Sequence, residues 1–181
     1  MNDKTDKSMK VTTEFAYSLL RGMRGLSSSG QLEKPVIFND LYGYILGRPN
    51  IDRSMVEKEL ESNVKLKEIC DEIISRERTF FASRLVAAQS TEVLDQRTGE
   101  GFVLKIRESN ADPNQYYLIL EVDILSYQKE HSRVVLHAYT DEQSGSCVFP
   151  ALQDGKSQII IEKDNKLLKL LRDSDPEISI I

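Results

Sequence analysis

The sequence contains few of the residue types from which catalytic and metal centres are most often built. Its 181 residues include two histidines, two cysteines and no tryptophan. Cys70 and Cys147 lie far apart, and neither His131 nor His137 stands at a ligand spacing from them, so a structural zinc site is not expected. The sequence also has no glycine-rich phosphate loop and no nucleophile–base pairing. We therefore expect no enzymatic activity, no cofactor and no metal.

Long hydrophobic runs are also missing. No apolar stretch approaches the roughly 18 residues that a membrane span requires. The first ten residues are polar and no apolar segment follows them, so no signal peptide is expected. These features predict a cytoplasmic protein without a membrane partner, in which both cysteines stay reduced.

Positive charge is not concentrated in any part of the chain. Residues 1–90 contain 14 Lys and Arg against 13 Asp and Glu, whereas residues 91–181 contain 10 against 16. Because phosphates are recognised by basic stripes, direct binding to nucleic acid is not expected. The acidic second half would suit a basic protein partner, although an acidic solvated surface is the commoner explanation.

The early part of the chain has helical periodicity. Phe15, Leu19 and Met23 recur at every fourth position and predict a helix over 10–24. The composition of LSSSGQLEK, which follows this helix, is that of a flexible linker.

The next stretch predicts two short helices joined by a turn. Asn39 or Asp40 can cap the first helix, and Gly47 can end it in a left-handed conformation. Asp52 or Ser54 can begin the second helix. A unit this short needs neighbouring helices to bury its apolar side chains. These are Leu41, Tyr42, Ile45, Leu46, Met55, Val56 and Leu60.

A further helix is predicted from about Val64 towards Phe80. Leu66, Ile69 and Ile73 recur on one side of it, and charged residues occupy the other sides. The first eighty or so residues therefore predict about four helices.

The two-helix stretch resembles the anti-sigma domain of bacterial sigma-factor regulators. In that family an aromatic-Leu-x-Gly motif precedes Val-Glu-x-His-Leu-x-x-Cys-x-x-Cys. The zinc ligands of the family fall here on Glu59, Asn63 and Leu66, so the resemblance is to a zinc-less branch and covers about a third of the chain. The matching residues are Tyr44, Ile45, Gly47, Val56, Glu57 and Leu60.

Near Phe81 the periodicity changes to the alternation that is typical of strands. The residues around it can continue the preceding helix or begin the first strand, and QRTGEG is typical of a turn. Six or seven strands with short connections predict an antiparallel sandwich or barrel. The strand segments are 102–106, 116–124, 133–139, 145–149 and 156–162, with KLLKLL at 166–171 ambiguous.

Residues 140–161 resemble the repeated pattern of transthyretin-like and carboxypeptidase-regulatory-like sandwiches. The resemblance implies that Val148 or Phe149 fills the core between two sheets together with Leu152. Gly155 can supply a positive φ for the turn into the next strand. This pattern implies a fold and no particular activity.

Two strand residues have a structural and a functional interpretation. His137 shares a strand face with Val135 and Tyr139, and we expect it at the surface or rim of the sheet. The strand that begins with Tyr116 and Tyr117 is expected to be a central core strand, although it could be an edge that pairs with a partner.

The predicted class is therefore α+β by segregation. A small N-terminal bundle of about four helices precedes an antiparallel β-sandwich of six or seven strands. The predicted boundaries are a disordered tail at 1–9, a helical anti-sigma-like domain at 10–82, a β-sandwich at 83–174 and a C-terminal tail at 175–181, in which ISII could add an edge strand.

The resemblance implies a non-enzymatic regulatory protein. Its helical domain would bind a sigma-factor-like protein and hold it away from RNA polymerase, with Phe15, Leu19 and Met23 as partner-binding anchors. Alternatively, these three side chains close the bundle by packing on Leu46, Val56 and Leu60. Another interpretation is a protein-interaction adaptor in a bacterial signalling or defence assembly. An enzyme with a site across the domain junction is the least favoured hypothesis.

Overall fold

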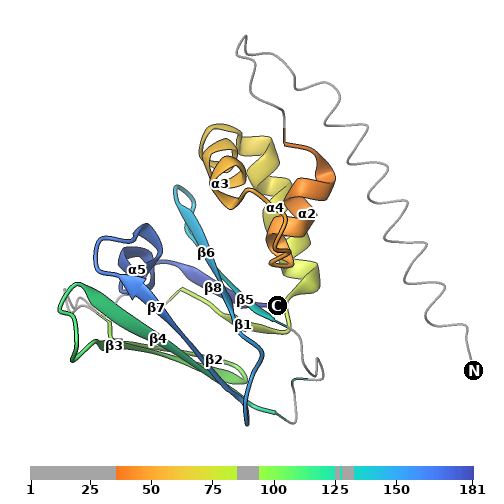
Figure 1. Ribbon diagram of the computed structural model, residues 1–181. Coiled ribbons are helices and arrows are strands. Elements are labelled where there is room, and N and C mark those ends of the chain that lie inside the picture. Colours follow the sequence, from red (N-terminus) through yellow and green to blue (C-terminus); the bar gives the residue numbers. More distant parts are fainter. Residues whose placement is uncertain (1–35, 85–93, 125–126, 128–132) are drawn as a thin grey trace, which may run out of the picture.

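The computed structural model describes residues 36–84, 94–124, 127 and 133–181. In these residues four helices and eight strands form an α+β structure with two antiparallel sheets of four strands each. Figure 1 shows helices α2, α3 and α4 together on one side of the sheets. The α+β class and the combination of helices with antiparallel sheets are confirmed, and there are eight strands where six or seven were predicted.

Three helices follow one another before the first strand. They are α2 (Phe38–Ile45), α3 (Arg53–Ser62) and α4 (Val64–Glu77). The α2 helix ends before Gly47, whose φ of 65° is the predicted left-handed conformation. Asp52 caps α3 through a hydrogen bond that its side chain accepts from Met55 N at 3.1 Å. Of the two predicted starts of this helix, Asp52 and Ser54, the first is therefore correct.

The start of α2 differs from the prediction. The N-cap residue is Ile37, not Asn39 or Asp40. Asp40 lies in the first turn and its Oδ2 accepts a hydrogen bond from Ile37 N at 3.1 Å. The carboxylate therefore satisfies a main-chain donor from inside the helix, where a negative charge also suits the helix dipole.

The first sheet, called sheet A, has the strand order β1-β8-β5-β6. The second, called sheet B, has the order β2-β3-β4-β7. In sheet A the strands are β1 (Phe80–Ala82), β8 (Glu177–Ile180), β5 (Val134–Tyr139) and β6 (Ser144–Phe149). In sheet B they are β2 (Gln96–Gly99), β3 (Phe102–Glu108), β4 (Gln115–Val122) and β7 (Lys156–Glu162).

The inner faces of the two sheets enclose the main core. Phe149 points into this core and Leu152 packs against it, as the sandwich resemblance implied, whereas Val148 lies on the other side of sheet A. Gly155 has a φ of 76° in the tight turn before β7. Tyr116 is buried in the same core, so β4 is a central strand.

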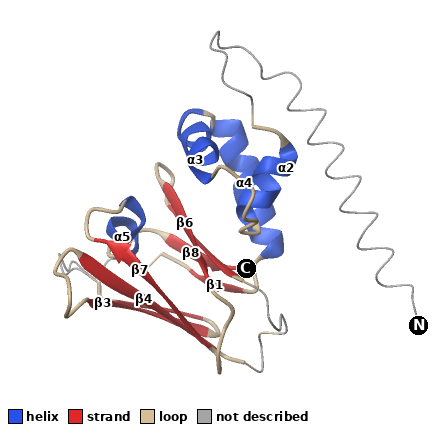
Figure 2. Cartoon of the chain, in the orientation of Figure 1, coloured by secondary structure: helices blue, strands red, loops and turns tan. Residues whose placement is uncertain are grey.

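The segment KLLKLL is a helix, α5 (Lys166–Leu171), that packs against β5 and β6. Asn165 caps it by accepting a hydrogen bond from Leu167 N at 2.8 Å. All four of its leucines are buried, which a strand with two alternating faces would not achieve here. Figure 2 shows this helix close to the sheets and apart from the other three helices.

The C-terminal residues form a central strand. Glu177–Ile180 make β8, which is hydrogen-bonded between β1 and β5, so this segment is neither a tail nor an edge strand. Its isoleucines are fully buried, which is the physical reason for its inclusion in the sheet. QRTG, predicted as part of a turn, is β2.

A second core lies on the outer face of sheet A. Helices α2, α3 and α4 cover this face (Figure 2), and Val135 and Ile181 are buried among their side chains. Strand β5 is therefore buried on both faces, with Val134 and Leu136 in the sandwich core. His137 is only 2% exposed, so the expectation that it lies at the surface was wrong because the helices cover its face.

Candidate functional site at the helix–sheet junction

A cluster of polar side chains joins the helices to sheet A. This junction cluster consists of Tyr44, Arg53, Glu57, His137 and Ser146. Ser146 Oγ donates a hydrogen bond to the Tyr44 hydroxyl at 2.8 Å, and that hydroxyl donates to Glu57 Oε1 at 3.2 Å. Arg53 contacts Ser146 and stacks over the Tyr44 ring at 4.4 Å. The cluster links α2, α3, β5 and β6.

His137 is bonded to the main chain of α2. Its Nε2 donates to the carbonyl oxygen of Ile45 at 3.0 Å, where the α2 helix ends. Burial lowers the pKa of His137 to about 4. The imidazole is therefore neutral near pH 7, with its Nε2 proton committed to a structural hydrogen bond.

The two cysteines are also chemically quiet. Cys70 and Cys147 are free thiols. Burial raises the pKa of both, to about 12 for Cys147, and the neighbouring Asp71 raises that of Cys70 further. Because a thiolate is the reactive form, neither thiol is prepared for nucleophilic chemistry at neutral pH. Cys70 lies in the core under the helices, and Cys147 packs against the sandwich core.

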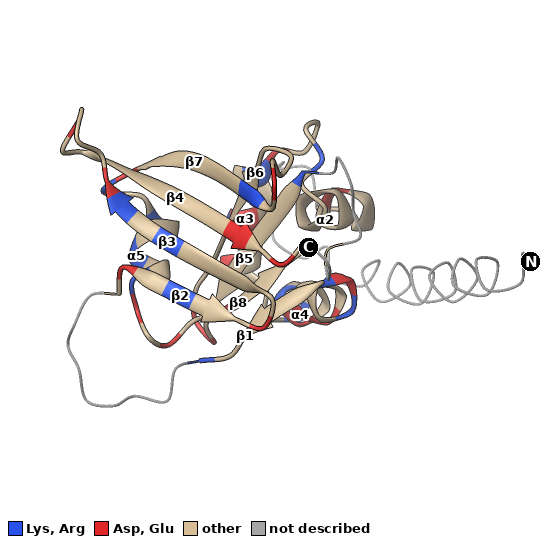
Figure 3. Cartoon of the chain, turned by 90° about the horizontal axis from the view of Figure 1, so that it is seen from below, with Lys and Arg blue, Asp and Glu red and all other residues tan. Residues whose placement is uncertain are grey.

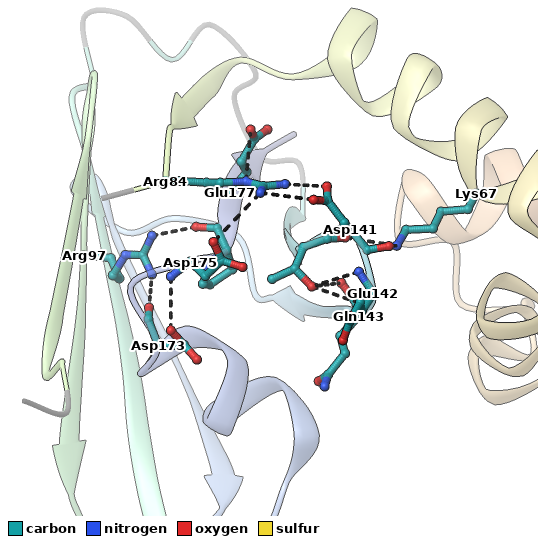
Figure 4. A network of polar contacts seen from close by, with 11 residues as sticks. Lys67, Arg84, Arg97, Asp141, Glu142, Gln143, Asp173, Asp175 and Glu177 are labelled. Atoms are coloured by element: carbon teal, nitrogen blue, oxygen red, sulfur yellow. Dashed lines mark hydrogen bonds and ion pairs between the residues drawn. The ribbon is translucent and has the colours of Figure 1, made fainter. Parts of the chain in front are cut away.

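A second polar network lies beside the junction cluster, where α4 faces the turn between β5 and β6 (Figure 4). Arg84 Nη2 lies 2.6 Å from Asp141 Oδ1, and Arg84 is also within 4 Å of Asp175 and Glu177. Lys67 Nζ donates to the carbonyl oxygen of Thr140 at 3.0 Å. These contacts join α4 to the turn between β5 and β6, and they join Arg84, which follows β1, to the same turn and to the start of β8. Exposed ion pairs of this kind contribute little to stability.

Asp71 on α4 lies among like charges. Burial raises the pKa of its carboxyl to about 6, with further raising contributions from Glu177 and Asp141 and a lowering one from Lys67. Its protonation state therefore changes just below neutral pH.

Arg97 is the buried cation of the sandwich. It is 1% exposed, and its guanidinium donates to the carbonyl oxygens of Asp173 and Pro176, the latter at 2.7 Å. Figure 4 shows the side chain reaching from β2 to the turn before β8. The sequence did not point to this residue, because QRTGEG is typical of a turn. The one feature that could have indicated a buried role was the presence of an arginine among these turn residues.

The three positions where the zinc ligands of the resembled family would fall meet at the corner between α3 and α4. Asn63 Oδ1 accepts a hydrogen bond from Leu66 N at 3.0 Å, and its Nδ2 donates to Glu59 Oε1 at 3.4 Å. Leu66 is 2% exposed in the helix-side core. In the described ranges, no group of three or more His, Cys, Asp or Glu side chains is placed to hold a metal ion.

The predicted partner-binding residues Phe15, Leu19 and Met23 lie outside the described residues, as does His131. No helix in the described part of the chain is long and apolar enough to cross a membrane. No family model matches the sequence, and neither a curated protein nor a solved structure matches it.

Proposed function

We propose that this protein is a non-enzymatic, anti-sigma-like regulator that binds a sigma-factor-like protein and holds it away from RNA polymerase. The binding surface is the apolar stripe formed by Phe15, Leu19 and Met23 at helical spacing. Partner helices would receive these side chains as anchors in a groove.

The observation that carries the proposal is that the described helices and sheet A together form the helical core. Val56 and Leu60 are buried in a cluster formed by α2, α3, α4 and sheet A. Leu46 packs against the same cluster. These were the residues on which the stripe would pack if it served only to close the bundle. Sheet A occupies a side of this core that the stripe would otherwise close, which favours a role for the stripe in binding another protein.

The corner between α3 and α4 is a further point in favour. The three ligand positions of the resembled family fall there on Glu59, Asn63 and Leu66, and Asn63 bonds to the Glu59 side chain and to Leu66 N. The hydrogen-bonded Asn63 and the buried Leu66 can hold this corner in place, as a metal would in zinc-containing members of the resembled family. The junction cluster then attaches helices α2 and α3 to the sandwich, which serves as a rigid support.

The decisive experiment compares Leu19→Asp with Tyr17→Asp in the full chain. Both substitutions introduce one negative charge, but helical spacing places Tyr17 on the side opposite the stripe. Binding to each purified sigma factor of the source cell would be measured by calorimetry, with circular dichroism as the control for folding. Leu19→Asp should keep the helical signal and weaken binding by more than about 2 kcal/mol, as for an anchor residue. Tyr17→Asp should bind normally.

Three outcomes would contradict the proposal. Loss of helical signal in Leu19→Asp would assign that residue to the fold. Unchanged binding in a folded Leu19→Asp protein would remove the stripe from the interface. Failure to bind any sigma factor, combined with stripe-dependent binding to a component of another assembly, would favour the adaptor.

A further inference from the structure

In the part of the chain that the structure describes, the edge of sheet B at β7 is open and regular. Figure 3 shows the four strands of sheet B side by side, with β7 along one margin and β2 along the other. Among the described residues, β1 lies against β2, and α3 and α5 pack along β6, whereas β7 makes a smaller contact with β6. Exposed edges are normally protected by proline, bulges or charged residues, and β7 (KSQIIIE) carries charge only at its two ends, Lys156 and Glu162.

The hydrogen bonds of β7 show which main-chain groups face outwards. Gly155 O accepts from Val122 N at 2.8 Å, and in an antiparallel ladder bonded pairs alternate along the strand. Odd-numbered residues of β7 therefore bond to β4, and even-numbered ones point away from it. Lys156 is already paired with Gln153 across the tight turn. The carbonyl oxygen of Glu162 also has a partner, since it accepts a hydrogen bond from Asn165 N at 3.1 Å. Among the described residues, the outward main-chain groups without a partner are thus those of Gln158 and Ile160 and the N–H of Glu162.

This free stretch of five residues is complementary to itself. When it is paired antiparallel with a second copy about Ile160, the two isoleucines face each other and Gln158 faces Glu162 of the second copy. If the second copy is shifted by two residues in one direction, Ile160 lies opposite the carboxylate of Glu162. A shift in the other direction directs Glu162 to Lys156, whose main chain the turn occupies. The register centred on Ile160 pairs the main chains of the two isoleucines, brings the Glu162 N–H to the Gln158 carbonyl oxygen of the second copy and places no charge against an apolar side chain.

The side chains on the outer face of sheet B favour the same register. Ile160 is 56% exposed and lies beside Tyr117 of β4. Pairing about Ile160 makes one continuous apolar row of Tyr117 and Ile160 from each copy.

We propose that β7 is a homodimerisation edge, at which two copies join their B sheets into one eight-stranded antiparallel sheet about a two-fold axis at Ile160. A closed two-fold arrangement satisfies both edges at once. The paired surface is small, so the dimer should form in a concentration-dependent manner. It leaves the helices on sheet A free, so it is compatible with partner binding by the N-terminal region.

Sedimentation velocity over a range of concentrations tests the proposal, using the full chain. Wild type should shift from monomer to dimer. Ile160→Lys places two like charges at the two-fold axis and should weaken dimerisation by about tenfold or more. Thr98→Lys adds the same charge to the exposed face of β2 at the opposite margin and should dimerise as wild type does. Circular dichroism checks that both variants fold.

Cross-linking tests the register. Directly opposed residues of a bonded antiparallel pair lie about 5.5 Å apart between Cα atoms, within the range that a disulfide spans. Mild oxidation of Ile160→Cys should therefore give a disulfide dimer, whereas Gln158→Cys, with the two thiols four residues apart along the strands, should not. A wild type that stays monomeric, a dimer unaffected by Ile160→Lys, or equal cross-linking of the two cysteine variants would each overturn the proposal.

Discussion

His137 on β5 and Asp71 on α4 both line the buried space between the helices and sheet A. Burial favours the neutral form of each, which lowers the pKa of His137 to about 4 and raises that of Asp71 to about 6. The two groups therefore change the stability of the fold with pH in opposite directions. At neutral pH the imidazole is in its favoured state, whereas the carboxyl is not.

The first prediction concerns His137. Its folded pKa of about 4 lies below the unfolded value, so its contribution is complete above about pH 6.5 and is lost as the pH falls towards 4. This residue alone should lower the free energy of unfolding by roughly 2 kcal/mol between pH 7 and pH 5. In His137→Gln, whose amide can still donate to Ile45 O, that part of the pH dependence should vanish. Urea denaturation at pH 5, 6 and 7 measures it, and identical pH profiles for the two proteins would contradict the prediction.

The second prediction concerns Asp71. Its folded pKa lies above the unfolded value, so its stabilising contribution is complete below about pH 4 and is lost as the pH rises through 6. Asp71→Asn should therefore raise the free energy of unfolding at pH 7.5, by about 1 kcal/mol after allowance for partial solvent screening. Little difference should remain at pH 4.

Asp141→Asn is the matched control for that variant. Its carboxylate pairs with Arg84, which lowers its pKa, so the same substitution should not stabilise the protein at pH 7.5. Thermal melts of both variants at the two pH values provide the comparison. Equal effects of the two substitutions would show that the burial of Asp71 is not the cause.

Single residues also show what a sequence can reveal. Alternation placed His137 on the same strand face as Val135 and Tyr139, and this is correct. Its burial could not be predicted, because it depends on helices that are distant in sequence and cover that face. The role of Arg97 was hidden by the turn-like composition of QRTGEG and also by distance, since its carbonyl partners lie at Asp173 and Pro176, far along the chain.

At the scale of elements, the corner between α3 and α4 depends on Asn63, which caps α4 and contacts Glu59. Asn63→Ala should lower the free energy of unfolding by about 1 kcal/mol, the usual cost of losing an N-cap. Ser62→Ala removes a neighbouring hydroxyl without touching the cap and should cost less.

A strong chelator should not change the melting temperature of the wild type. A fall that zinc restores would reveal a metal at this corner.

The end of α2, the start of α3 and the strands with clear alternation were predictable because their signals are local. Asp52 caps α3 from three residues away, Gly47 supplies the left-handed residue after α2, and burial alternates along β3, β4 and β7. The predictions were wrong where packing between distant segments determines the secondary structure. In KLLKLL the two lysines fall on one exposed side of a helix and the four leucines on the buried side, but six residues are too few for this pattern to exclude a strand. The space beside β5 and β6 selects the helix. The short segment EISI becomes a central strand because β1 and β5 provide both of its neighbours.

At the scale of the whole molecule, sheet A separates two cores and belongs to both. Its inner face completes the sandwich core, and its outer face, through Val135 and Ile181, completes the core under the helices. The predicted boundary between residues 82 and 83 falls directly after β1, which pairs with β8 inside sheet A. A division after Arg78 keeps that strand with its sheet.

The last prediction follows from this shared sheet. Residues 79–181 expressed alone should keep their strand signal, because their own side chains form the sandwich core. They should melt at a lower temperature than the full chain and bind a hydrophobic dye, since Val135, Tyr139 and Val148 lose their cover. Residues 10–78 alone should lack a cooperative transition, because sheet A closes one side of their core.

A third fragment, 83–181, provides the control, because it lacks β1 and should be less stable than 79–181. Circular dichroism and calorimetry on the three fragments and the full chain give the comparison. Cooperative unfolding of 10–78 alone would show that the helices need no sheet. A melting temperature of 79–181 equal to that of the full chain would show that the helices contribute nothing to the sandwich. Intermediate behaviour of both fragments would mean that sheet A couples the two cores, so that binding of a partner to the helical side would change the stability of the sandwich.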